Sequence, residues 1–354
     1  MNNTAFMSAD VNIATLNLFN YAEPPLAYHE FDSIYSLPQW QLKTQWISDW
    51  VDTAMPDILG IQEVFSPQAL QQQLTPHGFS HFAMAGEPSI DGYVAHQSVV
   101  MLASRLPIIE SSSVPLDFTL AARFGVSKEF SPSREMLRAT VQLPEIGTTD
   151  VYVVHLKSPR AMLGHQDVNL DGFSAALAGS ALGRWASVVK RGTEAMLLYQ
   201  AILERRAQTG YAVAVVGDFN ATIDSSELRG LLTAPNQLYR GDLHATGLLA
   251  LNEQERLCHL RHFQLQEAQT LARACVPDAH RRVSHFHGAK GSIVDHILLS
   301  QEFDGQQQHS LASVSQYQIF NQHLISPQHP HDDYASDHAP VMATIAPRHA
   351  AAKE

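Results

Sequence analysis

Several carboxylates and histidines in this sequence stand at the ends of apolar segments. Four segments end an apolar run in such a residue: Asp57–Glu63, Val151–Ser158, Ala212–Asn220 and Ser292–Ser300. A fifth, Ala335–Val341, places Asp337 and His338 directly ahead of an apolar run. Carboxylates bind divalent cations through oxygen, and histidines transfer protons near neutral pH. Five such segments in one chain indicate an enzyme with a hydrolytic site of the α/β type.

The composition is that of a globular protein. With 354 residues, 45% hydrophobic and 16% charged, the chain can bury a core as one large or two modest domains. No apolar run approaches the ~20 residues needed to span a bilayer, and the N-terminus lacks the features of a secretory signal. Cys258 and Cys275 are too few for a disulfide scaffold and are expected to be ordinary thiols. We therefore expect a cytoplasmic protein without a transmembrane segment or an obligatory protein partner.

The formal charge of −12 argues against broad electrostatic capture of nucleic acid, which depends on Lys and Arg. It does not exclude a nucleic-acid substrate. Carboxylates gathered around a divalent cation add to the negative total, and the bound cation reverses the local field.

Hydrophobic periodicity predicts strands alternating with helices. Apolar runs indicate strands at Val11–Asn17, Ile58–Gln62, Ser98–Ala103, Leu137–Leu143, Tyr152–Leu156, Val213–Val216, Ile293–Leu299, Ala312–Ile319 and Val341–Ile345. Helices are expected at Gln41–Ala54, from Ser66-Pro67 through Leu74, at Ser174–Gln208 as one long helix or a broken pair, and at Ser225–Leu232. No repeat or low-complexity linker divides the chain, so we expect one catalytic domain over residues 1–347 and a frayed tail over residues 348–354.

The order of the motifs resembles the endonuclease/exonuclease/phosphatase superfamily, and in particular its deoxyribonuclease-like phosphohydrolases. The matching residues are Thr15-Leu16-Asn17, Gln62-Glu63, His155, Gly217-Asp218-Phe219-Asn220, Asp295 and Ser336-Asp337-His338. The resemblance covers almost the whole chain. It implies an α/β (α+β) fold, a four-layer α/β/β/α sandwich of two packed mixed β-sheets flanked by helices. The active site would lie where loops from both sheets meet.

The resemblance also implies a divalent cation. Mg²⁺, with Mn²⁺ as a substitute, suits oxygen ligands and would be held by Glu63, supported by the side-chain carbonyl of Asn17 and by Asp337. His338 would take a proton from the attacking water or polarise the phosphate, and both roles stay open. Asp295 would fix the orientation of the His338 ring.

Further residues match substrate-facing positions of the family. Asp218 would orient the nucleophilic water, Asn220 would donate to a non-bridging oxygen, and His155 would donate to the phosphate or assist the leaving group. The deoxyribonuclease-like branch pairs this histidine with a glutamate on an earlier strand, whereas the alignable region here offers only Gln97. A second acid–histidine pair is therefore in doubt.

The loop after His155 offers additional phosphate donors in Lys157, Ser158 and Arg160, unless these residues serve only the solubility of the loop. Arg191 and Glu194, three residues apart on the long helix, would either brace the site or form an exposed ion pair. A substrate rim of basic residues is also conceivable, and its candidates are Arg123, Lys128, Arg134, Arg138 and Arg160.

Two other patterns point to metals. The segment Asp167–Gly172 matches the opening of a calcium loop, but Ala178 stands where the bidentate glutamate belongs, which favours a polar turn over a structural Ca²⁺ site. A zinc site would draw on His285, His287, His323, His329 and His331, whose spacing fits no closed zinc motif. His285 and His287 precede the Asp295 strand and are candidates for contact with substrate.

The predicted function is hydrolysis of a phosphodiester by activated water, with a nucleic acid as one candidate substrate. A phosphatase or phosphodiesterase acting on a small molecule or a lipid head group is the alternative, mildly disfavoured for lipids because no membrane anchor is evident. A binding module that has lost catalysis would lack a ligand or a proton-transfer group, and none of the principal positions is missing here.

Overall fold

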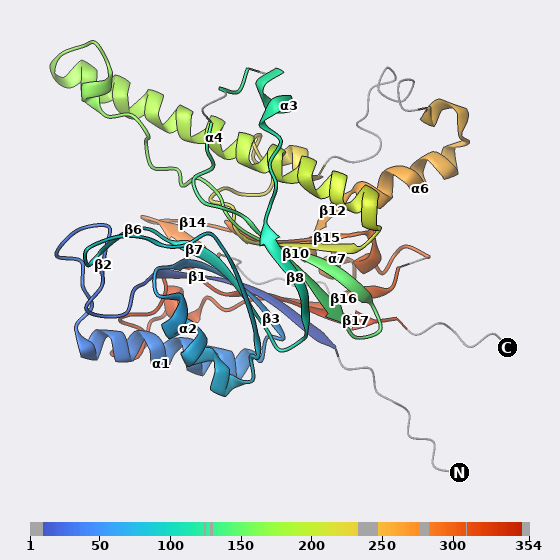
Figure 1. The fold of residues 1–354 in the computed structure, drawn as a ribbon, viewed down its shortest axis with the longest axis horizontal. Helices are drawn as coiled ribbons and strands as arrows, with labels where there is room; N and C mark the ends of the chain where they lie inside the picture. The colour runs from blue at the N-terminus through green and yellow to red at the C-terminus, as the bar shows by residue number, and fades with distance from the viewer. Residues whose placement is uncertain are drawn as a thin grey trace.

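The computed structural model describes residues 10–123, 125–127, 130–232, 247–275, 283–308 and 310–348. Two six-stranded sheets pack face to face, and helices cover the outer face of each (Figure 1). This is the expected four-layer α/β/β/α sandwich, and both of its sheets are mixed.

The first sheet has the strand order β16-β17-β1-β3-β7-β4. β1 and β3 run parallel, and each other neighbouring pair is antiparallel. The bounds are β1 Val11–Tyr21, β3 Ile58–Val64, β4 His81–Ala85, β7 Val99–Ser104, β16 Ala312–Ile319 and β17 Val341–Pro347.

The second sheet has the strand order β12-β15-β11-β10-β9-β8. β10 and β11 run parallel, and their neighbours are antiparallel. The bounds are β8 Ile108–Ser113, β9 Leu137–Leu143, β10 Gly147–His155, β11 Ala212–Asp218, β12 Leu265–Glu267 and β15 Asp295–Ser300. Smaller pairings join β13 His285–His287 to β14 Lys290–Ser292, and β6 Val94–Gln97 to β2 Ala27–Tyr28 and β5 Ser89–Asp91.

The outer layers consist of α1 Leu37–Ala54 and α2 Pro67–Leu74 on the first sheet and α4 Gly172–Thr209 on the second. The shorter helices are α3 Phe118–Arg123, α6 Glu253–Phe263, α7 Ala268–Cys275 and α8 Gln322–Ile325. Single 3₁₀ turns lie at η1 Thr75–His77, η2 His165–Asp167, η3 Arg229–Leu232, η5 Leu248–Ala250 and η6 Gln301–Phe303.

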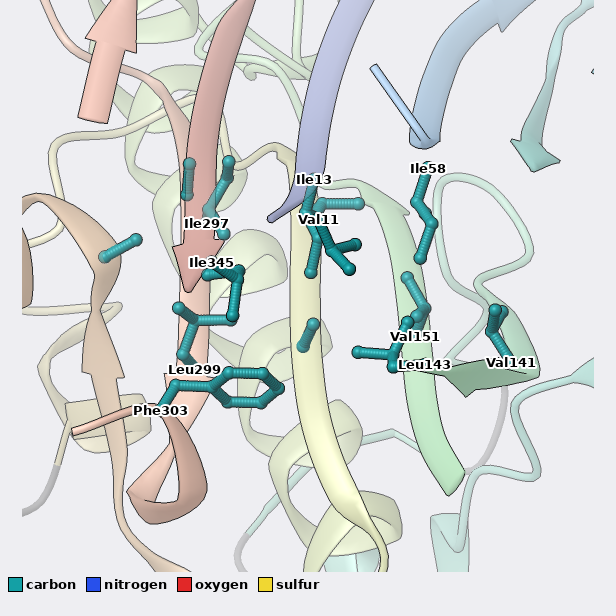
Figure 2. Packing of buried hydrophobic residues seen from close by; sticks show 14 of the residues in the cluster. Val11, Ile13, Ile58, Val141, Leu143, Val151, Ile297, Leu299, Phe303 and Ile345 are labelled. Carbon is teal, nitrogen blue, oxygen red and sulfur yellow. The ribbon is translucent and has the colours of Figure 1, made fainter. Parts of the chain in front are cut away.

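The largest apolar core lies between the two sheets. Figure 2 shows Ile13 and Ile58 of the first sheet in one cluster with Val151, Ile297 and Leu299 of the second. The sheets approach each other closely at Gly60 in β3. A Cβ added there would lie 2.4 Å from Val216 Cγ2 in β11, far inside van der Waals contact. Only a glycine allows this approach.

Most predicted elements are present, with several corrections. The Ser174–Gln208 pattern forms one helix, β1 runs beyond its predicted end, and β10 begins five residues before its predicted start. The helix expected at Ser225–Leu232 is wrong, since only the 3₁₀ turn η3 lies there. Arg348, assigned to a frayed tail, donates to the carbonyls of Gly305 and Gln307.

No helix among the described residues is long and apolar enough to cross a bilayer.

Candidate active site

The predicted site residues of the second sheet meet at one of its edges. His155 ends β10, Asp218 ends β11 and Asp295 begins β15. His155 pairs in register with Asp218, and Asp218 pairs with Asp295. Because side chains opposite each other on neighbouring strands point to the same face, the register places one histidine and two carboxylates side by side. All three are buried.

The position of Asp295 in its strand differs from the prediction. Its apolar run was expected to end at the carboxylate, whereas the carboxylate opens the strand. The reason is strand direction: β15 runs antiparallel to β11, so its first residue lies at the edge where β11 ends.

The first sheet contributes Asn17 from β1 and Glu63 from β3, which run parallel and end at the same edge. The β1–β3 register is interrupted after Asn17, where Phe19 and Asn20 have φ of 51° and 59°. This bulge aims the Asn20 N–H at Glu63 Oε2, at 3.0 Å. Glu63 itself has a φ of 62°. Left-handed backbone at non-glycine residues costs roughly 1–3 kcal/mol each and is concentrated at functional sites.

Asn17 joins the two sheets through its side-chain amide. Its Nδ2 donates to Glu63 Oε1 at 3.3 Å and to Asp218 Oδ2 at 3.2 Å, while its Oδ1 accepts from the backbone N–H of Phe19. The structure therefore differs from the expectation that the Asn17 carbonyl faces a metal beside Glu63. Asn17 instead holds two carboxylates in place by donating to both.

His338 and Asp295 form a buried pair. Asp295 Oδ2 lies 2.9 Å from His338 Nδ1, and His338 Nε2 lies 3.8 Å from Asp218 Oδ2. The loop that carries His338 is fixed by Ser336, whose hydroxyl donates to the Asn17 carbonyl and accepts from the His338 N–H. The ring is therefore oriented by Asp295 on one side and presents its other nitrogen to Asp218.

The positive charge of protonated His338 interacts with two buried carboxylates, those of Asp295 and Asp218. Burial alone would lower the pKa of His338, but the charges of Asp295 and Asp218 outweigh it and raise the pKa to about 10. Burial raises the pKa of Asp218, and Asp295 raises it further, while His338 opposes the change. His338 is thus an imidazolium at neutral pH, next to a carboxyl group that holds its proton more tightly than usual.

His155 lies on the other side of Asp218. Its Nε2 is 3.3 Å from Asp218 Oδ2 and 3.9 Å from Glu63 Oε1. Its Nδ1 is buried and has no hydrogen-bond partner among the described residues. Gln97, at the position of the family's glutamate, donates to the Ser133 carbonyl instead. Burial, followed by the charges of Arg134 and His338, lowers the pKa of His155 well below its usual value, so the ring is neutral.

Asp337 provides the remaining predicted metal ligand. Its side chain is 45% exposed, but its Oδ1 is covered and has no hydrogen-bond partner in the described part of the chain. Burial raises the pKa of Asp337, and the Glu63 charge raises it further, against His338 and Lys43. A covered carboxylate oxygen without a donor, in the field of a second carboxylate, is an arrangement that a hard divalent cation would stabilise.

Two groups of described residues bring metal-ligating atoms within 4.8 Å of one another. One is His285, Asp337 and His338, and the other is Asp218, Asp295 and His338. The His285 ring lies over the His338 ring at 4.5 Å between centroids. Of the histidines considered for zinc, His285 contacts the His338 ring, and His323 Nε2 lies 3.2 Å from the His338 backbone carbonyl. His329 pairs with Asp333, and His331 with Asp49 and Asp332.

The loop after His155 is held from beneath by α4. Glu194 accepts from the backbone N–H groups of Ser133 and Lys157, and Arg191 donates to the Lys157 carbonyl and to Glu227. Both α4 side chains are buried, so they brace the site rather than form an exposed pair. The Lys157 ammonium donates within its own loop to Ser158 and to the Arg160 carbonyl, and Arg160 is exposed.

Of the five rim candidates, Arg134 is the one whose charge acts on the site. Burial lowers the pKa of Arg134, and the charges of Glu63, Asp218 and Glu194 oppose this change. Arg138 is wrong as a rim residue, because it pairs with Glu110 and lies 3.8 Å from Asp150. The Arg123 side chain is exposed on α3, and Lys128 lies outside the described residues.

Sequence reasoning missed Lys43, which no motif marks because it lies in the middle of α1. The Lys43 side chain is buried, with its ammonium 5.4 Å from the Tyr35 ring centroid and 5.7 Å from that of Phe19. Burial lowers the pKa of Lys43 to about 7, against the charges of Asp337 and Glu63. The lysine therefore changes its charge near neutral pH within the field of the two predicted metal-binding carboxylates.

The remaining sequence signals have structural explanations. Asp167 accepts from the Gly164 N–H, and Asp171 is the residue before α4, so the calcium-like segment is a polar turn opening that helix. Cys258 is a free, exposed thiol on α6.

Comparisons with known proteins agree with this fold. The catalytic domain of human Nocturnin, solved with a bound sulfate, matches at 13% identity and a TM-score of 0.54, covering 96% of this chain and 95% of that one. An endonuclease/exonuclease/phosphatase protein from Bacteroides vulgatus matches at 16% identity and 0.53, covering 96% and 100%. An AP endonuclease from Archaeoglobus fulgidus matches at 14% identity and 0.50, covering 94% and 98%. No curated protein sequence matches.

At such low identity these structures show the fold alone. The sequence model of the endonuclease/exonuclease/phosphatase family matches residues 36–338, which is most of the chain and includes Glu63, His155, Asp218, Asp295 and His338. With the sandwich and the converging side chains, this match makes the protein a member of the endonuclease/exonuclease/phosphatase family and a hydrolase of phosphate esters.

Proposed function

We propose that this protein hydrolyses a phosphodiester by in-line attack of water with the help of a divalent cation. The observation that carries the proposal is the buried chain Asp295–His338–Asp218, with distances of 2.9 Å and 3.8 Å. It is surrounded by Glu63, Asn17 and His155 from both sheets. Residues from four strands and one loop converge on the same carboxylate, as acid–base chemistry at a phosphoryl group requires.

The predicted metal ligands fit a hard cation. Glu63 and Asp337 offer carboxylate oxygens, and Asp337 Oδ1 has no protein donor among the described residues. We assign them to Mg²⁺, with Mn²⁺ as a substitute, because this set is dominated by oxygen. When bound, the cation supplies charge neutralisation for the phosphoryl oxygens.

The protonation states support separate roles for His338 and Asp218. His338 is already protonated at neutral pH and therefore fits a donor to a non-bridging phosphoryl oxygen better than a base. Asp218 is the carboxylate whose raised pKa suits it to orient the water and accept its proton at Oδ2. Asp295 keeps the His338 ring oriented and charged.

The remaining polar groups are assigned to the substrate. Asn220, held at a φ of 55°, now donates to the Leu156 carbonyl and to Asp218, and would give one N–H to the phosphoryl group. Neutral His155 would donate from Nε2 to the phosphate or leaving oxygen. We add Arg134 to the earlier set of Lys157, Ser158 and Arg160, because its guanidinium acts on Glu63, Asp218 and His155 alike.

The test is a hydrolysis panel with Mg²⁺, Mn²⁺ and EDTA. It covers single- and double-stranded DNA, RNA, bis(p-nitrophenyl) phosphate, inositol phosphates and sphingomyelin. We expect Mg²⁺-dependent turnover of at least one ester, abolished by EDTA and reduced at least 100-fold in Glu63→Ala. Activity that persists in EDTA, or in Glu63→Ala, would contradict the proposal. Binding of an ester without turnover would support the non-catalytic alternative. The expected compartment, the cytoplasm, stays a prediction for localisation of the tagged protein.

A further inference from the structure

The long helix α4 has a part that does not cover the sheet. Figure 1 shows its N-terminal turns, together with the loop before them, projecting away from the two sheets. The C-terminal part packs on the second sheet through Ala195, Leu198 and Ile202. The N-terminal part has a different neighbour, the loop at residues 160–164.

The face that α4 turns to this loop consists of small residues. Ala175, Gly179, Gly183 and Ser187 are spaced four apart and buried. The Gly183 carbonyl accepts from the Met162 N–H, and Ser187 donates to the Arg160 carbonyl. A Cβ at Gly183 would lie 2.7 Å from the Leu163 nitrogen, so the close approach depends on a glycine.

The large apolar residues lie on the opposite side of the helix and face outward. We call Phe173, Leu177, Ala181, Trp185 and Val188 the outer stripe. Their spacing of four, four, four and three residues puts them on one face over roughly 22 Å of helix. Phe173 is 79% exposed, Trp185 66% and Leu177 58%. An ordinary surface helix buries its large apolar residues, so this arrangement is inverted and marks a binding surface.

The charge around the outer stripe identifies its partner. The N-terminal half of α4, residues 172–192, contains three basic residues and no acidic residue, in a chain of net charge −12. Arg191 is buried against Glu227, whereas Arg184 and the nearby Arg160 are exposed; Asp167 and Asp171 are exposed in the turn before the helix. Exposed Phe, Trp and Leu next to cations are typical of helices that rest in the interface of an anionic bilayer. A nucleic acid would leave aliphatic Leu177 and Val188 without a stacking partner.

We propose that the outer stripe docks the protein onto a membrane surface containing anionic phospholipids. Phe173, Leu177 and Trp185 would enter the boundary between head groups and acyl chains, and Arg160 and Arg184 would lie against the phosphates. The same loop connects the stripe to His155, so docking presents head-group phosphates to the active site. This last step, which names phospholipid head groups as the substrate class, rests on the proposed function.

The test is binding to vesicles, measured in EDTA so that no turnover is needed. The full chain is mixed with vesicles of phosphatidylcholine containing 30% phosphatidylglycerol, and with vesicles of phosphatidylcholine alone. We expect co-sedimentation, a blue shift of tryptophan fluorescence from the exposed Trp185, and at least fivefold stronger binding to the anionic vesicles. Absence of binding, or equal binding to both compositions, would overturn the proposal.

Matched variants locate the surface. The triple variant Phe173→Ser, Leu177→Ser, Trp185→Ser should reduce the vesicle partition coefficient at least tenfold. The control Leu37→Ser, Met55→Ser, Ile109→Ser alters three apolar residues of similar exposure on other elements (68%, 57% and 59%) and should change it less than twofold. A triple variant that still binds like the wild type would overturn the proposal. A second result would also overturn it: a wild type that binds no vesicles and is a dimer, together with a triple variant that is a monomer. The outer stripe would then be the interface between two copies of this chain.

The vesicle assay separates this proposal from the proposed function. Hydrolysis of soluble bis(p-nitrophenyl) phosphate should be the same in the wild type, the triple variant and the control. Vesicle binding without hydrolysis of any ester would defeat the proposed function and leave the docking surface standing. Hydrolysis of the soluble ester by a protein that does not bind vesicles would support the proposed function and defeat the docking surface.

Discussion

His338 and His155 are both buried, and both present Nε2 to Asp218 Oδ2, at 3.8 Å and 3.3 Å. They differ at the other ring nitrogen. His338 Nδ1 is held by Asp295, whereas His155 Nδ1 has no partner among the described residues. The pKa of His338 is raised and the pKa of His155 is lowered. The Asp295 carboxylate behind the ring, together with Asp218, keeps His338 charged, whereas burial and the charges of Arg134 and His338 keep His155 neutral.

This difference divides the chemistry between the two rings. A charged ring stabilises the negative phosphoryl group, while a neutral ring offers a hydrogen bond without repelling Arg134. Changes to each ring, to its partner and to the pH test this division of roles.

The largest effect is expected from His338→Ala. It removes the charge that faces both Asp218 and Asp295, so kcat/KM should fall at least 100-fold with the native circular dichroism spectrum retained. Steady-state kinetics on the ester found in the substrate panel measures the effect. A variant that keeps more than a tenth of the wild-type rate would remove His338 from the mechanism.

Asp295→Asn tests the partner rather than the ring. The amide keeps the size of the side chain but not its charge, so the pKa of His338 should fall and the rate above neutral pH should drop about 10- to 100-fold. The alkaline limb of the pH–rate profile should move to lower pH. An unchanged limb would show that Asp295 does not set the charge of His338.

His155→Gln should have a smaller effect, about tenfold in kcat/KM, because one neutral hydrogen bond is lost and no charge changes. Gln97→Ala serves as the control. Gln97 binds the Ser133 carbonyl, and we expect its loss to change the rate less than threefold. A Gln97→Ala defect equal to that of His155→Gln would mean that the two residues act as a pair after all.

The smallest expected effect is a pH dependence of stability in metal-free protein. Because the pKa of folded His155 lies below its unfolded value of ~6.5, only the unfolded chain takes up this proton, and stability falls as the pH drops below 6.5. Between pH 7 and pH 5 the wild type should lose more stability than His155→Gln in urea unfolding, because the variant has no imidazole at this position. Equal losses would refute the lowered pKa.

The raised pKa of His338 has the opposite sign. Its contribution to stability is complete below the unfolded pKa of ~6.5 and is lost as the pH rises towards 10. Imidazole proton resonances should show His338 titrating near pH 10 and His155 remaining neutral well below pH 6.5. Titration midpoints near pH 6.5 for both rings would contradict the difference in pKa between His338 and His155.

Glu63 and Asp218 could be predicted from the sequence because each follows directly after the apolar run of a buried strand. The last residues of neighbouring parallel strands lie at the same end of a sheet, which is where an active site of this type forms. Sequence reasoning could not place Arg134 or Lys43. Their contribution depends on which loop or helix packs over the site, and no local pattern encodes that contact. It also placed Asp295 at the wrong end of its strand, because strand direction within a sheet is a tertiary property.

The two halves of α4 show a similar limit. Apolar residues recur along the whole helix, and periodicity alone assigns them to a core. Only the structure shows that Gly179 and Gly183 take the inner face of the N-terminal half and leave Phe173 and Trp185 outside.

The contact at Gly60 has a consequence for the geometry of this site. Gly60 lies three residues before Glu63, and Val216 lies two residues before Asp218, so their contact helps to set the separation of the two halves of the active centre. A single methyl group at position 60 would push the two sheets apart at this point. The distance across which the reaction takes place therefore depends on a hydrogen atom that stands where every other amino acid has a carbon.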